Sequence, residues 1–115
     1  MSAEQLRDLK IKSWAVKRTT KEYLYYFKEL KGEQERLEKM KSEGKDEYDI
    51  KQQDNVVAES GIMIPETKKS LEQVLQALQE CLSQLEGSLP EECAEKDEAL
   101  QFVAAAKDAL ESEPQ

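Results

Sequence analysis

Apolar residues recur at a seven-residue spacing along two long stretches of this chain. Because seven residues complete nearly two helical turns, side chains at this spacing return to one face of an α-helix. Each row therefore forms a seam that must be buried against another helix, and two such seams joined by a short linker predict an antiparallel hairpin. The first row is Leu9, Val16, Tyr23, Leu30 and Leu37, and the second is Ile50, Val57, Ile64, Leu71, Leu78 and Leu85.

Capping residues and glycines divide the chain into three predicted helices. Ser2 and Gln5 form a capping-box pair at the start of the first helix, and Gly44 follows its end. Gly87 follows the second helix, and the segment 88–91 then supplies a capping serine, a first-turn proline and a glutamate that open the third. The predicted helices span about residues 2–42, 47–86 and 89–112 of one domain.

Pro65 lies inside the second predicted helix, where its ring presses on the carbonyl group of Gly61. The apolar seam keeps its phase across this point, so we expect a bend rather than the end of the helix. The bend either wraps the helix around its neighbours or also shapes a surface for a partner. The predicted fold class is all-α: an elongated antiparallel three-helix bundle with two long helices, a shorter third helix and a proline kink in the second.

A weaker apolar stripe along the third helix predicts that this helix lies in the groove between the first two. The stripe consists of Leu89, Cys93, Leu100, Val103 and Leu110, with the small residues Ala99 and Ala106.

Composition narrows the possible functions. The chain has no histidine and only two cysteines, of which Cys81 lies in the second seam and is predicted to act as a small apolar residue. No catalytic site, metal site or cofactor is therefore predicted. A net charge of −8 argues against nucleic acid or membrane as a partner. The absence of a signal peptide or a run of about 20 apolar residues predicts a cytoplasmic protein.

Positive charge is nevertheless concentrated in the first helix. Residues 7–31 hold eight Lys and Arg against three Asp and Glu, whereas residues 80–115 hold ten Asp and Glu against two Lys. We call the Lys, Arg and aromatic side chains beside the first seam the basic strip. Either Trp14 and its lysines contact an acidic partner, or the lysines cover the seam and the third helix buries Trp14. The strip includes Lys10, Trp14, Lys17, Arg18, Lys21 and Tyr25.

Several sequence blocks resemble the tubulin-binding cofactor A family, the tubulin-specific chaperones A. The resemblance covers roughly residues 4–86. The blocks are LKIK at 9–12, VKR at 16–18, KE at 21–22, YDIKQQ at 48–53 and ESGIMIP at 59–65.

This resemblance implies a three-helix bundle that holds β-tubulin in the postchaperonin folding pathway, with other tubulin-folding cofactors as further partners. It also implies a cytoplasmic, cytoskeleton-associated protein that acts without catalysis, as a monomer or weak dimer. Because tubulin is acidic, the basic strip is predicted to form one half of the surface that contacts it. Further candidate contact residues are expected near the bend. The predicted partner-binding residues are Lys10, Lys12, Trp14, Lys17, Arg18, Lys21, Tyr25, Tyr48, Lys51 and Met63.

A structural or adaptor coiled coil is the alternative prediction. Such a protein would use the same seams to pair with a second copy or to tether a cytoskeletal partner. The short linker at residues 44–46 favours closure of the seams within one chain.

Overall fold

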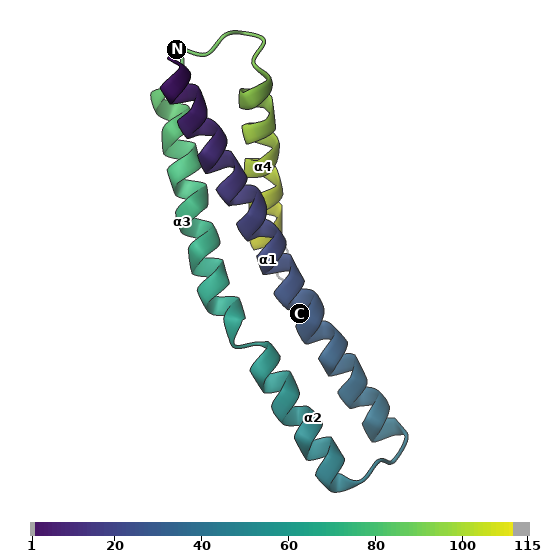
Figure 1. Ribbon diagram of the computed structural model, residues 1–115. Helices are drawn as coiled ribbons and strands as arrows, with labels where there is room; N and C mark the ends of the chain where they lie inside the picture. Colours follow the sequence, from purple (N-terminus) through teal and green to yellow (C-terminus); the bar gives the residue numbers. More distant parts are fainter. Residues whose placement is uncertain (1, 112–115) are drawn as a thin grey trace.

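The computed structural model describes residues 2–111 and is a helical rod (Figure 1). Its principal extents are 64 × 20 × 18 Å. This arrangement confirms the predicted all-α elongated bundle. The helices are α1 (Ala3–Ser42), α2 (Glu47–Ser60), α3 (Met63–Gln84) and α4 (Ala94–Glu111).

Helix α1 begins and ends where the sequence predicts. The Ser2 side chain accepts a hydrogen bond from the Gln5 amide, and the Gln5 side chain accepts one from the Ser2 amide, so both halves of the capping box are present. At the other end Gly44 adopts a positive φ of 68°, a conformation that glycine accepts without steric cost. The chain then reverses into α2, which packs antiparallel to the C-terminal half of α1.

The apolar core lies in one half of the rod. Helix α4 packs on both α1 and α3, alongside the N-terminal half of α1 (Figure 1). This confirms that the last helix lies against the other two. The arm formed by α2 and residues 24–42 of α1 buries Leu37 but contributes no residue to the main buried apolar cluster. That cluster consists of Leu9, Val16, Tyr23, Leu71, Leu75, Leu78, Cys81, Leu85, Ala99, Val103, Ala106 and Ala109.

The bend expected at Pro65 is present, but the helix is interrupted rather than only kinked. Gly61 and Ile62 separate α2 from α3, and Pro65 is the third residue of α3. Because proline has no amide hydrogen, the Gly61 carbonyl accepts from the Ile64 amide at 3.3 Å instead. Gly61 and Ile62 both keep right-handed helical dihedral angles, so the apolar seam resumes in phase on α3.

The last helix begins later than predicted. Residues 85–88 form turns, with Gly87 at a φ of 84°, residues 89–93 are irregular, and α4 starts at Ala94 instead of residue 89. The reason is that this segment must carry the chain from the end of α3 across to α4, so the capping signal at Ser88 does not begin a helix. Leu100 also departs from the predicted stripe, because it is 47% exposed. The buried stripe of α4 is Ala99, Val103, Ala106 and Ala109.

Candidate binding surface

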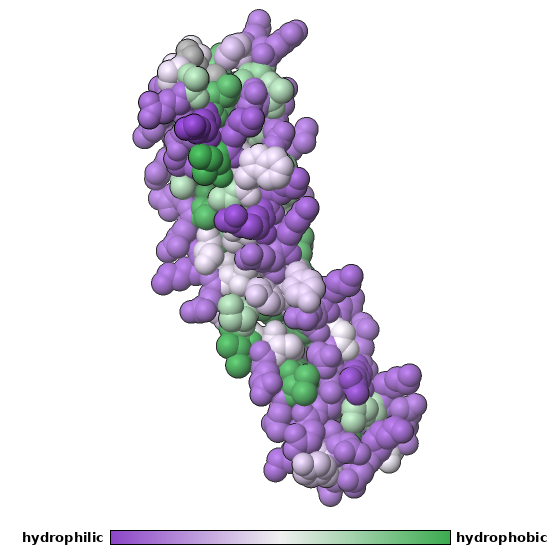
Figure 2. Space-filling view, in the orientation of Figure 1, coloured by the Kyte–Doolittle hydropathy of each residue, from purple (hydrophilic) through white to green (hydrophobic). Residues whose placement is uncertain are grey.

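The basic strip lies on the outward face of α1. Trp14 is 53% exposed and Ile11 is 61% exposed, while the adjacent Ser13 is buried. The alternative in which the last helix buries Trp14 is therefore wrong, because more than half of this side chain remains exposed beside α4. Figure 2 shows the surface in this view as largely hydrophilic, with pale and green side chains scattered over the upper part of α1 and near the α2–α3 junction.

Lys12 is already paired within the protein. Its ammonium group lies 2.6 Å from Oδ1 of Asp8, one helical turn earlier, and this hydrogen bond raises the pKa of Lys12. The other Asp8 oxygen, Oδ2, lies 3.9 Å from Sγ of Cys81 on α3. Burial, followed by the Asp8 charge, raises the pKa of the Cys81 thiol. This cluster joins α1 to α3. Because Lys12 is paired with Asp8, it is not one of the free cations beside the strip.

Lys17 is engaged as well. Its ammonium nitrogen lies 4.7 Å from the centre of the Trp14 ring and 5.5 Å from the centre of the Phe102 ring on α4. Lys17 is half-buried and bridges α1 to α4. Lys10, Arg18 and Lys21 are exposed, and within residues 2–111 they form no ion pair. These three side chains are the unpaired cations of the strip.

Tyr25 extends the strip toward the middle of the rod. It is exposed, and its hydroxyl donates a hydrogen bond to Oε1 of Glu29 at 2.9 Å. This hydrogen bond raises the pKa of Tyr25. The Tyr25 ring lies edge-on to Tyr26, with ring centres 5.9 Å apart. Tyr25 also lines a shallow hollow between α1 and α2, which Val56 borders from the other side.

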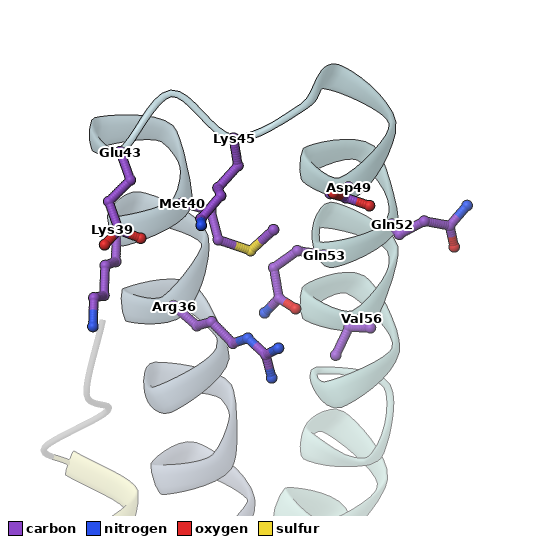
Figure 3. A pocket seen from close by; sticks show the side chains of 9 residues that line it. All are labelled: Arg36, Lys39, Met40, Glu43, Lys45, Asp49, Gln52, Gln53 and Val56. Atoms are coloured by element: carbon purple, nitrogen blue, oxygen red, sulfur yellow. The ribbon is translucent and has the colours of Figure 1, made fainter.

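A second hollow lies between α1 and α2 at the end of the arm (Figure 3). Arg36, Met40 and Gln53 extend into the space between the helices, and Gln52 points away from α1. The Gln53 side-chain nitrogen donates to the Glu33 carbonyl oxygen at 3.0 Å and to Oε2 of its carboxylate at 2.7 Å. The lining mixes both signs of charge: Arg36, Lys39, Met40, Glu43, Lys45, Asp49, Gln52, Gln53 and Val56.

Sequence reasoning missed Gln53 because it considered only apolar residues for the seams and did not ask what a polar residue inside a seam would contact. The signal was available: Gln53 lies between Ile50 and Val57 at the position where a heptad seam usually carries a second apolar residue. A polar side chain at such a position predicts a specific buried partner.

The candidate residues outside the strip do not form one site with it. Tyr48 and Lys51 were expected near the bend, but they lie in the first turns of α2, at the opposite end of that helix from the interruption. Both are exposed, and they line a hollow beside the α1–α2 connection. Met63 is the only one of the three at the interruption, where it begins α3 and is exposed.

Within residues 2–111, no group of three or more His, Cys, Asp or Glu side chains is placed to hold a metal ion. None of the helices in this range has both the length and the apolar character of a membrane-crossing segment. Fold and surface together define an elongated α-helical bundle whose candidate sites are open helix faces and shallow hollows.

Comparison with known proteins assigns this bundle to a family. The sequence model of the family described as "Tubulin binding cofactor A" matches residues 4–109. Tubulin-folding cofactor A of Arabidopsis thaliana is 42% identical over 99 residues, which cover 86% of this chain and 88% of that protein. The chain belongs to the tubulin binding cofactor A family.

Solved structures of this family share the fold. The crystal structure of the Arabidopsis thaliana cofactor superposes with a TM-score of 0.86 at 39% identity, covering 93% of this chain and 99% of that one. Human tubulin chaperone cofactor A superposes with a TM-score of 0.77 at 37% identity, covering 90% of this chain and 98% of that one.

Proposed function

We propose that this chain binds β-tubulin in the cytoplasm and holds it, without catalysis, in the postchaperonin stage of tubulin folding. Membership of the tubulin binding cofactor A family supports tubulin as the client. The observation that carries the proposal is the exposed, unpaired cations of the basic strip, on a chain whose net charge is −8. Such a local reversal of charge suits an acidic client.

The mechanism is binding by mass action. A protein that binds a folded or nearly folded client lowers the concentration of free client that is available to aggregate. The exposed aromatic side chains Trp14 and Tyr25 supply apolar contact area, while Lys10, Arg18 and Lys21 attract the client. The rod leaves these groups on its outside and needs no internal cavity. Tyr48, Lys51 and Met63 are further contacts that the client reaches only if it extends along the rod toward α2.

Capture of purified β-tubulin tests the proposal. We expect the double substitution Arg18→Glu with Lys21→Glu to weaken capture at least tenfold, since it reverses two free charges of the strip. The matched control is Lys96→Glu with Lys107→Glu, which changes the net charge equally on exposed positions of α4 and leaves capture near its original level. Equal losses in both double variants, or no loss in the first, contradict the strip as the contact.

The client and the pathway step need separate measurements. Immobilised protein is offered α-tubulin and β-tubulin in turn, and retention of β-tubulin alone supports the proposed specificity. Release of the bound β-tubulin to another tubulin-folding cofactor tests the step.

The adaptor alternative predicts a different solution state. The seam residues in the core half of the rod are buried within one chain, which supports an elongated monomer or weak dimer over an obligate oligomer. The chaperone proposal expects this form to retain β-tubulin. An obligate oligomer that ignores tubulin, detected by sedimentation, favours the adaptor.

A further inference from the structure

We propose that the N-terminal end of α1 binds an acidic segment of the client protein that carries a large apolar side chain, and that this side chain is seated between Ile11 and Trp14. This rests on the proposed function only in taking the segment to belong to the tubulin client. We call the surface the N-terminal patch. It is a shallow hollow lined by Ala3, Leu6, Arg7, Lys10, Ile11 and Trp14.

The patch is an exposed apolar surface that the fold does not use. Ile11 and Trp14 are three residues apart on a helix, so their side chains are neighbours, and both are more than half exposed. All the residues that line the hollow belong to α1, so no other helix closes it. Leu6 lines the same hollow and is half-buried. An apolar cluster left open in this way is typical of a surface that a partner covers.

The charges around the patch select an acidic partner. Arg7 and Lys10 line the hollow and are exposed. Of the nearby carboxylates, Asp8 is held by Lys12 and by contact with Cys81, which leaves Glu4 as the unpaired acid in the first turn of α1. Arg18 and Lys21 continue the positive charge along the helix. The patch is therefore cationic on a chain that is otherwise acidic, and an acidic segment complements it.

The Trp14 ring is contacted by Lys17, which limits its motion before an apolar side chain binds. The Lys17 ammonium group lies 4.7 Å from the ring centre and also approaches Phe102 of α4, which restrains the indole. A restrained aromatic ring loses little conformational freedom on binding. Together Trp14 and Ile11 provide a preformed apolar anchor point beside two cations.

A second copy of the chain is the competing occupant, and contact through its acidic helix α4 is disfavoured. The acidic helix α4 uses Ala99, Val103 and Ala106 to pack on its own bundle. Within the described residues, Leu100 is the one large apolar side chain of α4 that is exposed. One leucine is too little apolar surface to sustain a stable interface between copies.

Trp14 is the only tryptophan of the chain, so its fluorescence reports directly on the patch. The probe is a synthetic 15-residue helical peptide without tryptophan that carries leucine on one face and glutamate on the other. We expect a saturable blue shift of Trp14 emission, and an affinity that falls at least tenfold between 50 and 300 mM salt. A peptide with serine in place of leucine, and one with lysine in place of glutamate, give no saturable shift.

Substitutions then separate the patch from the rest of the rod. We expect Ile11→Ser and Lys10→Glu each to weaken peptide binding by about tenfold. The first removes an apolar contact with leucine, and the second reverses a charge that attracts glutamate. The controls Leu100→Ser and Lys107→Glu alter exposed residues of α4 and leave the affinity unchanged. No blue shift, or equal effects of patch and control substitutions, overturns the inference. A blue shift that depends on protein concentration without peptide identifies a second copy as the occupant and also overturns it.

Labelling with 5-fluorotryptophan distinguishes failure of this inference from failure of the proposed function. A fluorine resonance from residue 14 reports on this chain even when β-tubulin is bound. If β-tubulin is captured and the resonance shifts, the result supports both the proposed function and the N-terminal patch as a binding site. If β-tubulin is captured and the resonance does not move, the inference fails alone. If the peptide binds but β-tubulin is not captured, the proposed function fails and the patch must serve another acidic partner.

Discussion

Gln53 of α2 is joined to Glu33 of α1 by two hydrogen bonds from one amide nitrogen, at 3.0 Å to the carbonyl oxygen and 2.7 Å to the carboxylate. Gln53 is 6% exposed and is the one residue of α2 that is buried. Its apolar neighbours Ile50 and Val57 are only half-buried. The arm is therefore held by a polar contact and a thin apolar seam, while the core cluster lies in the other half of the rod.

We predict that Gln53→Ala loosens the arm without loosening the core. Loss of a part-buried hydrogen bond to a charged group costs about 1.5 kcal/mol, which corresponds to about a tenfold increase in local opening. Amide hydrogen exchange in α2 accelerates accordingly, whereas exchange in α3 near Leu78 does not change. Gln52→Ala is the control, because Gln52 is exposed and points away from α1 (Figure 3). Uniform acceleration along the whole chain contradicts a separately held arm.

The heptad seams predicted most of the fold because burial enforces them. Leu9, Val16 and Tyr23 are fully buried, as are Leu71 and Leu78, so the spacing alone identified the faces that meet. Helix ends were predicted correctly where a local capping motif sets them, as at Ser2. The start of α4 was not predicted correctly. It depends on how many residues the chain needs to cross from the end of α3 to the place where α4 packs, and local capping signals do not encode that length.

The candidate site was predictable only in part. Charge and aromatic content located the basic strip, but sequence spacing does not show which cations are already paired. Lys12 is held by Asp8, and Lys17 lies over Trp14. The exposure of Trp14 likewise depends on which face of α1 the last helix covers, and that is settled by the packing of Ala99 and its neighbours.

We predict that Asp8→Asn makes the Cys81 thiol more reactive. The Asp8 charge, after burial, raises the pKa of Cys81, so its removal lowers that pKa and increases the thiolate fraction at a given pH. Site-resolved alkylation followed by mass spectrometry measures the rate at Cys81 from pH 7 to 10. Cys93, which contacts Glu95 instead, is the internal control and keeps its rate. A slower reaction at Cys81 in the variant would refute the assignment.

We predict that stability falls in alkaline solution. The folded state raises the pKa of Lys12, of Tyr25 and of Cys81 above ordinary values of 10.5, 10.0 and 9.0. Above pH 9 the folded state therefore holds more protons than the unfolded state, and the free energy of unfolding decreases as pH rises through the folded pKa values. Urea unfolding between pH 7 and 11 measures this slope.

Two variants assign the alkaline slope. Asp8→Asn removes the partner that raises the pKa of Lys12 and also weakens the effect on Cys81, so its slope is shallower. Tyr25→Phe removes the contribution of the hydrogen bond to Glu29. If both variants show the same slope as the parent protein, then other titratable groups cause the loss of stability above pH 9.

We predict opposite effects of alanine at two glycines. Gly61 has a φ of −90°, and a Cβ there would lie 3.8 Å from Leu30, which is ordinary van der Waals contact. Gly61→Ala therefore stabilises the protein by about 0.5–1 kcal/mol, because alanine restricts the unfolded chain at no steric cost. Gly44 has a φ of 68°, so Gly44→Ala forces an L-residue into a left-handed conformation and destabilises by about 1 kcal/mol.

Thermal and urea unfolding of the two alanine variants provide the measurement. The comparison is sharp because each substitution adds the same methyl group, and within the described residues nothing crowds a Cβ at Gly44. Any difference in sign therefore comes chiefly from the backbone conformation, since a Cβ at Gly61 makes only ordinary van der Waals contact with Leu30. If Gly61→Ala is destabilising by more than about 0.5 kcal/mol, the helical dihedral angles assigned to Gly61 are wrong.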